Sequence, residues 1–465
     1  MPHRRPLLAA AVLLLTLGVL YLPDAGHGFL RDDFAWIRAS RLSGLGDLPR
    51  LFATDNGFYR PLVNLSFALN HAVFGLSPLG YGLTNLLLML AAAAALFGLT
   101  RASGLPPGTP LVATALWALN PHSIPMAVLW ISGRTSLLLT VFCLLAARSV
   151  VKDQRPAAAL WCLAALLSKE EAVLLPAILF LWAGLAVEKG LGFRWRQALV
   201  RTWPLLLTVV PYALLRARTA AYLPQTAPAY YRPTLSPSLL LANALEYADR
   251  SLTLGLVLLL LLWLVSRKRP HLEAAERLGI ARGLILALGS FGVTLFLPVR
   301  SSLYVCLPAT GTALAIAAVA GALWRNVGQA GQRRLLAGGL FLPLLLVPTY
   351  RARARRWVTP ADVSHAVFME LAQSPAPAGA VTVIHDATGR ASVAGAFGTH
   401  VQDALALATG ASRPRVWLDP PPPLWESTGL RPPRPGEKVH EFTLRDGHLV
   451  PGVAATPSGR APTVL

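Results

Sequence analysis

Residues 252–269 read LTLGLVLLLLLWLVSRKR, an apolar run without a charged side chain that ends in three consecutive cations. A bilayer core about 30 Å thick requires roughly 20 apolar residues in a helix. Short cytoplasmic loops carry an excess of Lys and Arg. The stretch therefore predicts a membrane-spanning helix whose basic end, Arg267 to Arg269, lies on the cytoplasmic side.

The same alternation of apolar runs and short polar segments recurs along the chain, and it predicts an α-helical polytopic membrane protein with about 10–11 transmembrane helices. Several runs are short, and two neighbours can form a re-entrant pair in place of two spans. The expected spans are approximately 7–22, 82–100, 107–120, 135–150, 156–167, 171–187, 202–216, 252–266, 282–299, 303–324 and 334–350.

The composition agrees with a membrane protein. Of the 465 residues, 54% are hydrophobic and 14% are charged, whereas soluble globular proteins carry about 25% charged residues. The formal charge of +20 resides in short clusters between apolar runs. That placement favours topology signals and lipid headgroup contacts over a nucleic-acid-binding face.

The basic clusters predict an orientation. His3-Arg4-Arg5 precedes the first apolar run, and Tyr21-Leu22-Pro23-Asp24 is a poor signal-peptidase site, so we expect an uncleaved helix with a cytoplasmic N-terminus. The clusters at 148–155, 189–201, 267–282 and 325–334 then fall inside, and only the cluster at 351–356 falls outside. The richness in Arg, Ala, Leu and Pro is typical of bacteria, which makes a bacterial inner membrane the expected location.

Two polar segments frame the expected domains, a transmembrane part over residues 1–350 and a small extracytoplasmic domain over 351–465. The first outer loop, 23–80, contains a semi-apolar stretch, Pro61–Phe74, expected to form a helix along the membrane surface. The tail carries a predicted strand, Ala380–His385, and a predicted helix near Val401–Ala408. It also has a Pro-rich segment, Pro420–Pro423, before a disordered end. We therefore expect an α/β appendage.

The first outer loop opens with Asp32-Asp33. Neighbouring carboxylates so close to a span are costly unless they are solvated or paired. They are either part of a solvated loop with Arg31 as a partner, or a general base or cation ligand at the outer face. Two close carboxylates raise the pKa of one of them, so that it can accept a proton near neutral pH. The pair also suits Mg²⁺ or Mn²⁺, although nothing in the sequence requires a metal.

Further polar groups are predicted on the same side of the membrane. The planar fork of Arg60 suits a phosphate, although Arg60 could instead anchor the interface together with Tyr59. Lys169 and Glu170 lie between two apolar runs without an intervening loop, which indicates a site or an internal ion pair. Arg300 is either a second phosphate contact or a snorkelling anchor. Asn64, His122, Arg134 and Tyr304 complete a set that predicts one site opening toward the periplasm or an equivalent lumen.

The order of these motifs resembles a known family. DDF (32–34), YRPL (59–62), NPHS (120–123), WISGR (130–134), LSKEEAVLLP (167–176), LYVCLP (303–308) and TYRARARRW (349–357) follow one another along the chain. Together they resemble the membrane half of the transmembrane-and-TPR O-mannosyltransferases and their bacterial relatives, which are GT-C-type glycosyltransferases. The resemblance covers about residues 5–360.

The resemblance implies sugar transfer from a polyprenyl- or dolichyl-phosphate donor to an acceptor hydroxyl outside the cytoplasm, in one inverting displacement. The family's catalytic carboxylates would fall on Asp32 and Asp33. Arg60, Lys169 and Arg300 would handle the donor phosphate. Further donor or substrate contacts would be Tyr59, Asn64, His122, Arg134, Glu170 and Tyr304. The acceptor, a protein or a glycan, is left open. No P-loop or dinucleotide-binding motif is found, in keeping with a lipid-linked donor.

Two departures and two alternatives accompany this interpretation. Thr135 and Ser136 follow Arg134 where relatives often carry an acidic residue, and residues 351–465 contain no TPR pattern.

A polytopic transporter would carry ionisable groups near mid-membrane in two related halves, and no such repeat is found. A catalytically silent membrane scaffold with 351–465 as its working part is the other alternative. Donor turnover separates the enzyme from the scaffold, and a vesicle flux assay separates it from the transporter.

Overall fold

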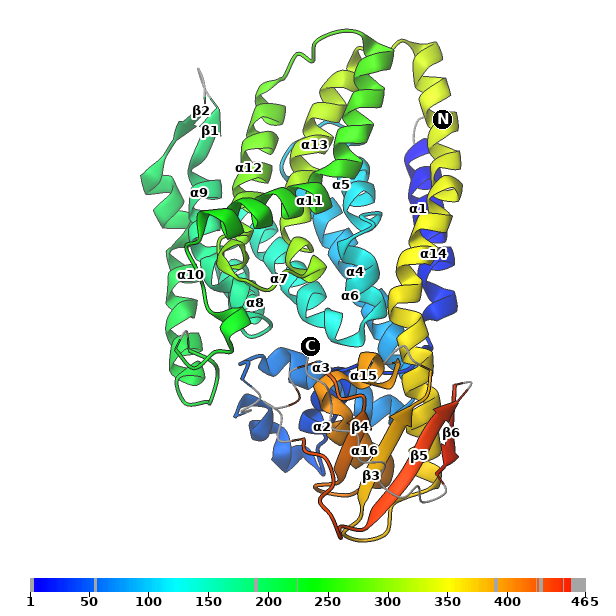
Figure 1. The fold of residues 1–465 in the computed structure, drawn as a ribbon. Coiled ribbons are helices and arrows are strands. Elements are labelled where there is room, and N and C mark those ends of the chain that lie inside the picture. The colour runs from blue at the N-terminus through cyan, green and yellow to red at the C-terminus, as the bar shows by residue number, and fades with distance from the viewer. Residues whose placement is uncertain are drawn as a thin grey trace. The chain divides into compact units, whose positions relative to one another are not determined.

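The computed structural model of the protein describes residues 4–53, 57–187, 191–223, 225–388, 392–423, 425, 430–445 and 447–452 (Figure 1). The chain divides into two compact units. The first, called here the helical unit, comprises Met1–Ala25 and Leu42–Ala354. The second, called here the α/β unit, comprises Gly26–Arg41 and Arg355–Leu465.

The helical unit confirms the predicted class, a helical membrane protein, because each expected apolar run overlaps a helix, although the run at 282–299 is α-helical only as far as Ser290. Five helical segments, Leu7–Asp24, Pro78–Ala102, Ile131–Val151, Trp195–Arg216 and Pro237–Ser266, are long and apolar enough to cross a bilayer. The helices are α1 (Arg4–Tyr21), α3 (Pro61–Phe74), α4 (Pro78–Ala102), α5 (Thr109–Ala118), α6 (Ser123–Leu129), α7 (Arg134–Val151), α8 (Arg155–Leu166), α9 (Leu175–Gly184), α10 (Trp195–Arg216), α11 (Pro237–Ser266), α12 (Ala274–Ser290), α13 (Pro308–Arg325) and the first part of α14 (Gln329–Gln373). The helix expected over Pro61–Phe74 is α3.

Prolines set where several of these helices begin. Proline lacks the backbone N–H that a first helical turn leaves unpaired, so it is well tolerated there. The expected span 171–187 therefore starts as an α-helix only at Leu175, beside Pro176, and a 3₁₀ turn, Glu170–Leu174, precedes it. Likewise α13 starts at Pro308 after the turn Ser302–Val305. Both turns carry residues that the sequence proposes for the site.

The expected span 171–187 is also wrong at its end. The helix stops at Gly184, and an antiparallel hairpin follows, made of β1 (Leu185–Val187) and β2 (Leu191–Phe193). A Cβ atom at Gly184 would lie 2.2 Å from the ring of Phe193. The ring thus occupies the space of a side chain at position 184, which is why the strand can fold back there.

Burial separates inner from outer helices in the helical unit. In the apolar stretch that contains α7, 78% of the residues are buried, and α7 packs against α4 and α8. Only 11% of the apolar stretch of α11 is buried. Such a surface suits contact with lipid chains, since apolar helices without a polar face are stable only when buried or in a bilayer.

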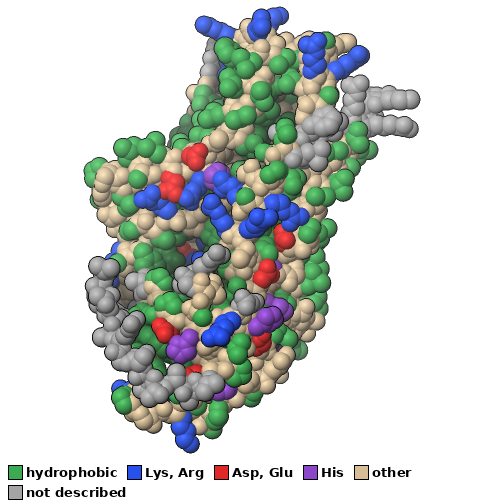
Figure 2. Space-filling model, turned by 45° about the vertical axis from the view of Figure 1, so that its right-hand side comes forward, with side chains coloured by type: hydrophobic (Ala, Val, Ile, Leu, Met, Phe, Trp, Pro, Cys, Tyr) green, Lys and Arg blue, Asp and Glu red, His purple; other side chains and the backbone are tan. Residues whose placement is uncertain are grey.

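The basic clusters at 267–282 and 325–334 meet at one end of the helical unit. Arg325 pairs with Glu276 at 2.8 Å, and Asn326 donates to the Arg269 carbonyl at 3.2 Å. Figure 1 shows the α11–α12 and α13–α14 connections at the same end of the helical unit, and Figure 2 shows Lys and Arg side chains, in blue, at that end. Their shared end is consistent with the sequence-based assignment of both clusters to the same side of the membrane.

The α/β unit has a four-stranded sheet in the order β4-β3-β5-β6, with β3 parallel to both β4 and β5 and β5 antiparallel to β6. The strand and the helix predicted from the tail are β3 and α16. The elements of the unit are α2 (Asp33–Ser40), the rest of α14, β3 (Val381–Asp386), α15 (Ser392–Phe397), α16 (Val401–Thr409), β4 (Arg415–Asp419), β5 (Val439–Arg445) and β6 (His448–Pro451).

Candidate functional site

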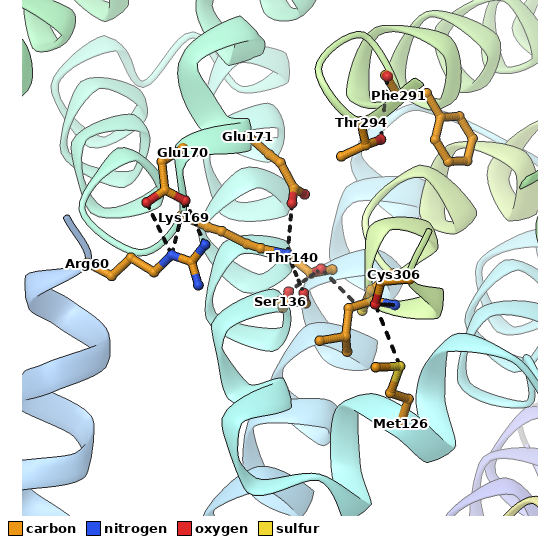
Figure 3. Close-up of polar contacts among 12 residues, drawn as sticks. Arg60, Met126, Ser136, Thr140, Lys169, Glu170, Glu171, Phe291, Thr294 and Cys306 are labelled. Carbon is orange, nitrogen blue, oxygen red and sulfur yellow. Dashed lines mark hydrogen bonds and ion pairs between the residues drawn. The ribbon is translucent and has the colours of Figure 1, made fainter. Parts of the chain in front are cut away.

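A buried ion pair lies at the turn between α8 and α9. The Lys169 ammonium is 2.8 Å from a carboxylate oxygen of Glu171, and the two side chains are only 4% and 9% exposed. Lys169 also donates to the Ser136 hydroxyl at 2.9 Å, at the start of α7 (Figure 3). Removing two charges from water costs several kcal/mol per ion before their attraction offsets it. A pair placed at such cost is a candidate for function.

A second ionic group lies beside it. Arg60 presents its guanidinium edge to Glu170, with Nη2 at 2.8 Å and Nε at 3.0 Å from Oε2 (Figure 3). The Arg60 guanidinium stacks on the ring of Phe58 at 4.2 Å. Arg216, at the end of α10, lies 3.9 Å from the other oxygen of Glu170. Its Nη1 atom is buried and donates no hydrogen bond to the described residues. Two guanidinium groups thus share one carboxylate.

Tyr304 belongs to the same site through its contact with Lys169. The ammonium of Lys169 lies 5.1 Å from the centroid of the Tyr304 ring, within the range of a cation–π contact. The structure therefore brings together Arg60, Lys169, Glu170 and Tyr304, four of the residues that the sequence proposes. We call these four, with Glu171 and Arg216, the ionic cluster. It holds three cations, Arg60, Lys169 and Arg216, and two carboxylates, so its formal charge is 3 − 2 = +1.

The other proposed residues of the helical unit have separate partners. Arg300 donates to Glu246 at 2.6 Å, and Arg250 pairs with the same carboxylate. Tyr59 is fully buried, 6.0 Å from the ring of Tyr212, and no partner for its hydroxyl is found among the described residues. Asn64 donates to the Leu51 carbonyl at 3.1 Å, and His122 lies 3.2 Å from Arg353.

Arg134 lies in the protein core. Its side chain is fully buried, and it donates to Asn70 at 2.6 Å and to Asn85 at 3.1 Å. Its guanidinium also stacks on Phe67 at 4.2 Å. These contacts satisfy a buried charge and connect α3, α4 and α7, so they account for Arg134 structurally. Its role as a substrate contact stays a prediction.

Asp32 and Asp33 belong to the α/β unit. Asp33 begins α2, is fully buried, and accepts a hydrogen bond from the Leu30 backbone N–H at 2.8 Å. The Asp33 N–H donates back to the Leu30 carbonyl at 2.9 Å. Asp32, at the residue before the helix, is partly exposed. The reciprocal bonds hold the carboxylate of Asp33 in one place, and Asp32 keeps access to solvent.

Several residues of these groups were not predicted from the sequence. Arg216 ends an expected span on its outer side, where the positive-inside bias makes cations uncommon, and that exception was a usable signal. Glu246 gave no such signal, nor did His400 and Asp403, which contact each other at 3.2 Å in the α/β unit. Among the residues that the structure describes, no three His, Cys, Asp or Glu side chains are arranged to hold a metal ion.

Comparison with known proteins finds no matching family model. A curated relative, protein O-mannosyl-transferase Tmtc1 of Drosophila melanogaster, is 35% identical over 140 residues. The match covers 28% of this chain and only 16% of the length of Tmtc1. It confirms the resemblance to the O-mannosyltransferases that the motifs predict.

Two solved structures of ArnT from Cupriavidus metallidurans are also similar. One is bound to undecaprenyl phosphate and has a TM-score of 0.47, and the other is in the apo state with a TM-score of 0.49. Each is 13% identical, and the alignment covers 89% of this chain and 85% of ArnT. At this level of similarity, neither structure assigns a substrate or a site residue to the chain.

Proposed function

We propose that the protein is a membrane glycosyltransferase that moves a sugar from a polyprenyl-phosphate donor to an acceptor hydroxyl on the outer side of a bacterial inner membrane. The sequence similarity to a protein O-mannosyl-transferase supports sugar transfer as the class of reaction. A hexose such as mannose is the expected sugar. The observation that carries the proposal is the ionic cluster at the helix ends.

The cluster is better explained by substrate binding than by stability. Replacing a buried ion pair with apolar side chains of similar volume is often neutral or stabilising, so such pairs are weak evidence for stability. Ionisable groups in a membrane protein mark a functional site by default. The cluster carries a formal surplus of one positive charge, and Arg216 has a buried N–H without a hydrogen-bond partner in the described chain. A phosphate diester or monoester supplies the missing negative charge and acceptor oxygens.

Arg60 and Lys169 would then stabilise the leaving group. In the transfer, an oxygen of the acceptor hydroxyl forms a bond to the anomeric carbon while the bond from that carbon to the phosphate oxygen breaks. The bonding pair stays on the phosphate, whose charge grows as it leaves. Cations held in place before the reaction stabilise that growing charge without reorganising, and removing one such group costs about 10²–10³ in rate.

Asp32 or Asp33 would take the proton of the attacking hydroxyl. A general base needs a fixed position and an ionised carboxylate at the working pH. Asp33 has the fixed position, since Leu30 donates to its Oδ2 atom at 2.8 Å. Asp32 has the solvent access. Attack opposite the phosphate inverts the anomeric configuration in one step.

The proposal is tested with purified protein and a polyprenyl-phosphate hexose. We expect Asp33→Asn or Asp32→Asn to lower turnover by about 10²–10⁴, the range supplied by a general base. Asp47→Asn is a matched control, because Asp47 lies in the same expected outer loop and pairs with Arg50 at 3.4 Å. Wild-type turnover in both Asp32→Asn and Asp33→Asn would show that the base is assigned wrongly.

A further inference from the structure

The segment that carries Asp32 and Asp33 is built into the fold of the C-terminal residues. Its residues 26–41 and the chain from Arg355 onward form one compact unit. Phe34 stacks between Phe368 and Phe397, at centroid distances of 5.8 and 5.3 Å. A Cβ atom at Gly28 would lie 2.3 Å from the Ala361 carbonyl oxygen, so the backbone approaches α14 as closely as only glycine permits.

Both flanks of the carboxylate pair are tied to one short segment, residues 395–403. On one flank, the Arg31 backbone N–H donates to the Ala396 carbonyl at 2.9 Å, and its Nε donates to the Gly395 carbonyl at 3.1 Å. On the other flank, Arg38 pairs with Asp403 at 2.8 Å. The segment 395–403 thus binds the chain on both sides of Asp32 and Asp33, at Arg31 and at Arg38.

His400 lies in the middle of this segment. Its Nδ1 atom is 3.2 Å from Oδ2 of Asp403, while Oδ1 of the same carboxylate accepts from Arg38. The Arg38 guanidinium is held further by the Ser412 carbonyl at 2.6 Å. Asp403 therefore fixes the imidazole on one side and the helix that begins at Asp33 on the other.

The electrostatic setting of His400 includes both candidate carboxylates. Burial works against the charged imidazole, but its hydrogen bond to the Asp403 carboxylate and the negative charges of Asp32, Asp403 and Asp33 outweigh it and raise the pKa of His400 above its usual value. The same pairing with His400 and Arg38 holds the pKa of Asp403 below its usual range, although burial opposes it. Arg31 also lies at this segment, with its Cγ atom 3.6 Å from the position of a Cβ at Gly398.

We propose that His400 is a positioning residue for the transferase reaction, whose protonated imidazole keeps the neighbouring carboxylates of Asp32 and Asp33 ionised and ready to accept a proton. The inference rests on the proposed function and deepens it, because it makes the C-terminal residues part of the catalytic machinery. The simpler alternative is a structural role, in which His400 only precedes α16 and pairs with Asp403. The two roles differ in how activity depends on pH.

The expected direction of the shift in the pH profile follows from the charge of the imidazole. An opposite charge nearby favours the ionised form of a carboxylate, so losing the imidazolium raises the pH at which the base becomes competent. We expect His400→Gln to move the acidic limb of the kcat/KM profile up by about one pH unit, which lowers kcat/KM roughly tenfold on that limb. At alkaline pH, where the carboxylates are ionised in both proteins, the profiles converge. His400→Lys restores the charge and the acidic limb.

The matched control is His448→Gln. His448 lies in the same unit and also pairs with a carboxylate, Glu370, at 2.8 Å. It is far from Asp32 and Asp33 in sequence. It should leave the profile unchanged. A drop in kcat/KM by the same factor at every pH for His400→Gln, with no recovery in His400→Lys, would assign His400 a purely structural role and overturn the inference.

A second measurement needs neither activity nor a His400 variant. Diethyl pyrocarbonate modifies neutral imidazole, so the pH dependence of labelling at His400, read by mass spectrometry in the full chain, reports its titration. The His400 side chain is 34% exposed, enough for the reagent to reach it. Because coupling is reciprocal, the midpoint should fall in Asp32→Asn and in Asp33→Asn, while that of His448 stays constant.

An unchanged His400 midpoint in both variants would overturn the inference whatever the turnover. Failure of the proposed function looks different: Asp32→Asn and Asp33→Asn would then keep wild-type sugar transfer, which the labelling experiment does not measure. The two results are therefore distinguishable.

Discussion

At the scale of single residues, the buried charges of the helical unit serve two different purposes. Arg134 has its hydrogen bonds satisfied by neutral amides and carbonyls, and it connects three helices. Lys169 and Glu171 instead neutralise each other at a turn. The first arrangement makes a core specific, whereas the second leaves charged groups that an anionic ligand can recruit.

This difference yields a prediction for the Lys169–Glu171 pair. Lys169→Met leaves Glu171 buried without its partner, which should reduce the free energy of unfolding by about 3–5 kcal/mol. The double variant Lys169→Met/Glu171→Met removes both charges, and its thermal midpoint in detergent should return to near the wild-type value. Sugar transfer should stay low in both variants. A double variant with wild-type turnover would show that the pair is structural.

At the scale of elements, helices that touch through glycine depend on the missing side chains. Gly283 of α12 and Gly311 of α13 face each other: a Cβ atom at Gly311 would lie 2.5 Å from the Gly283 carbonyl oxygen and 2.5 Å from the Ala287 nitrogen. Small residues at helix interfaces let backbones approach closely in membrane proteins. The two backbones leave no room for even one methyl group.

We therefore predict that Gly311→Ala separates α12 from α13 and lowers stability by about 1–3 kcal/mol, the usual cost of overpacking. The matched control is Gly338→Ala in α14, since a Cβ atom there meets nothing within 4 Å. That control should be neutral or slightly stabilising because alanine favours the helix. The thermal midpoints of both variants and of the wild type, measured in the same detergent, check both expectations. A midpoint of Gly311→Ala equal to that of Gly338→Ala would contradict the close packing of α12 and α13.

At the scale of the whole molecule, the orientation in the membrane decides which side the chemistry can use. The three cysteines, Cys143, Cys162 and Cys306, are all free and buried. Introduced cysteines can therefore be labelled with a membrane-impermeant maleimide over a low background. We expect Leu45→Cys and Arg434→Cys to react from the outer side, and Lys268→Cys to react only after the membrane is permeabilised. Labelling of Leu45→Cys and Lys268→Cys from the same side would contradict the topology.

Much of the fold could be predicted from the sequence. A bilayer requires long apolar runs, and each run can be recognised from its own residues alone, so every expected span overlaps a helix. The helix over Pro61–Phe74 was predicted to the residue. Helix ends were harder to predict. The helix α9 starts at Leu175, beside Pro176, and ends at Gly184, so it is shorter than the expected span. Local turn geometry overrides hydropathy at both ends.

The sequence by itself determined the class of protein, most of each helix and four members of the ionic cluster, Arg60, Lys169, Glu170 and Tyr304, since these are recognised from neighbouring residues. Only the tertiary structure decided which distant residues meet. Arg31 bonds to Gly395, 364 positions away, and Arg38 to Asp403, 365 positions away. Contacts over such separations leave no period or spacing in the chain, because they arise when packed elements close a loop whose length the local pattern does not record. For that reason, only the folded chain shows that the segment carrying His400 binds the residues on either side of Asp32 and Asp33.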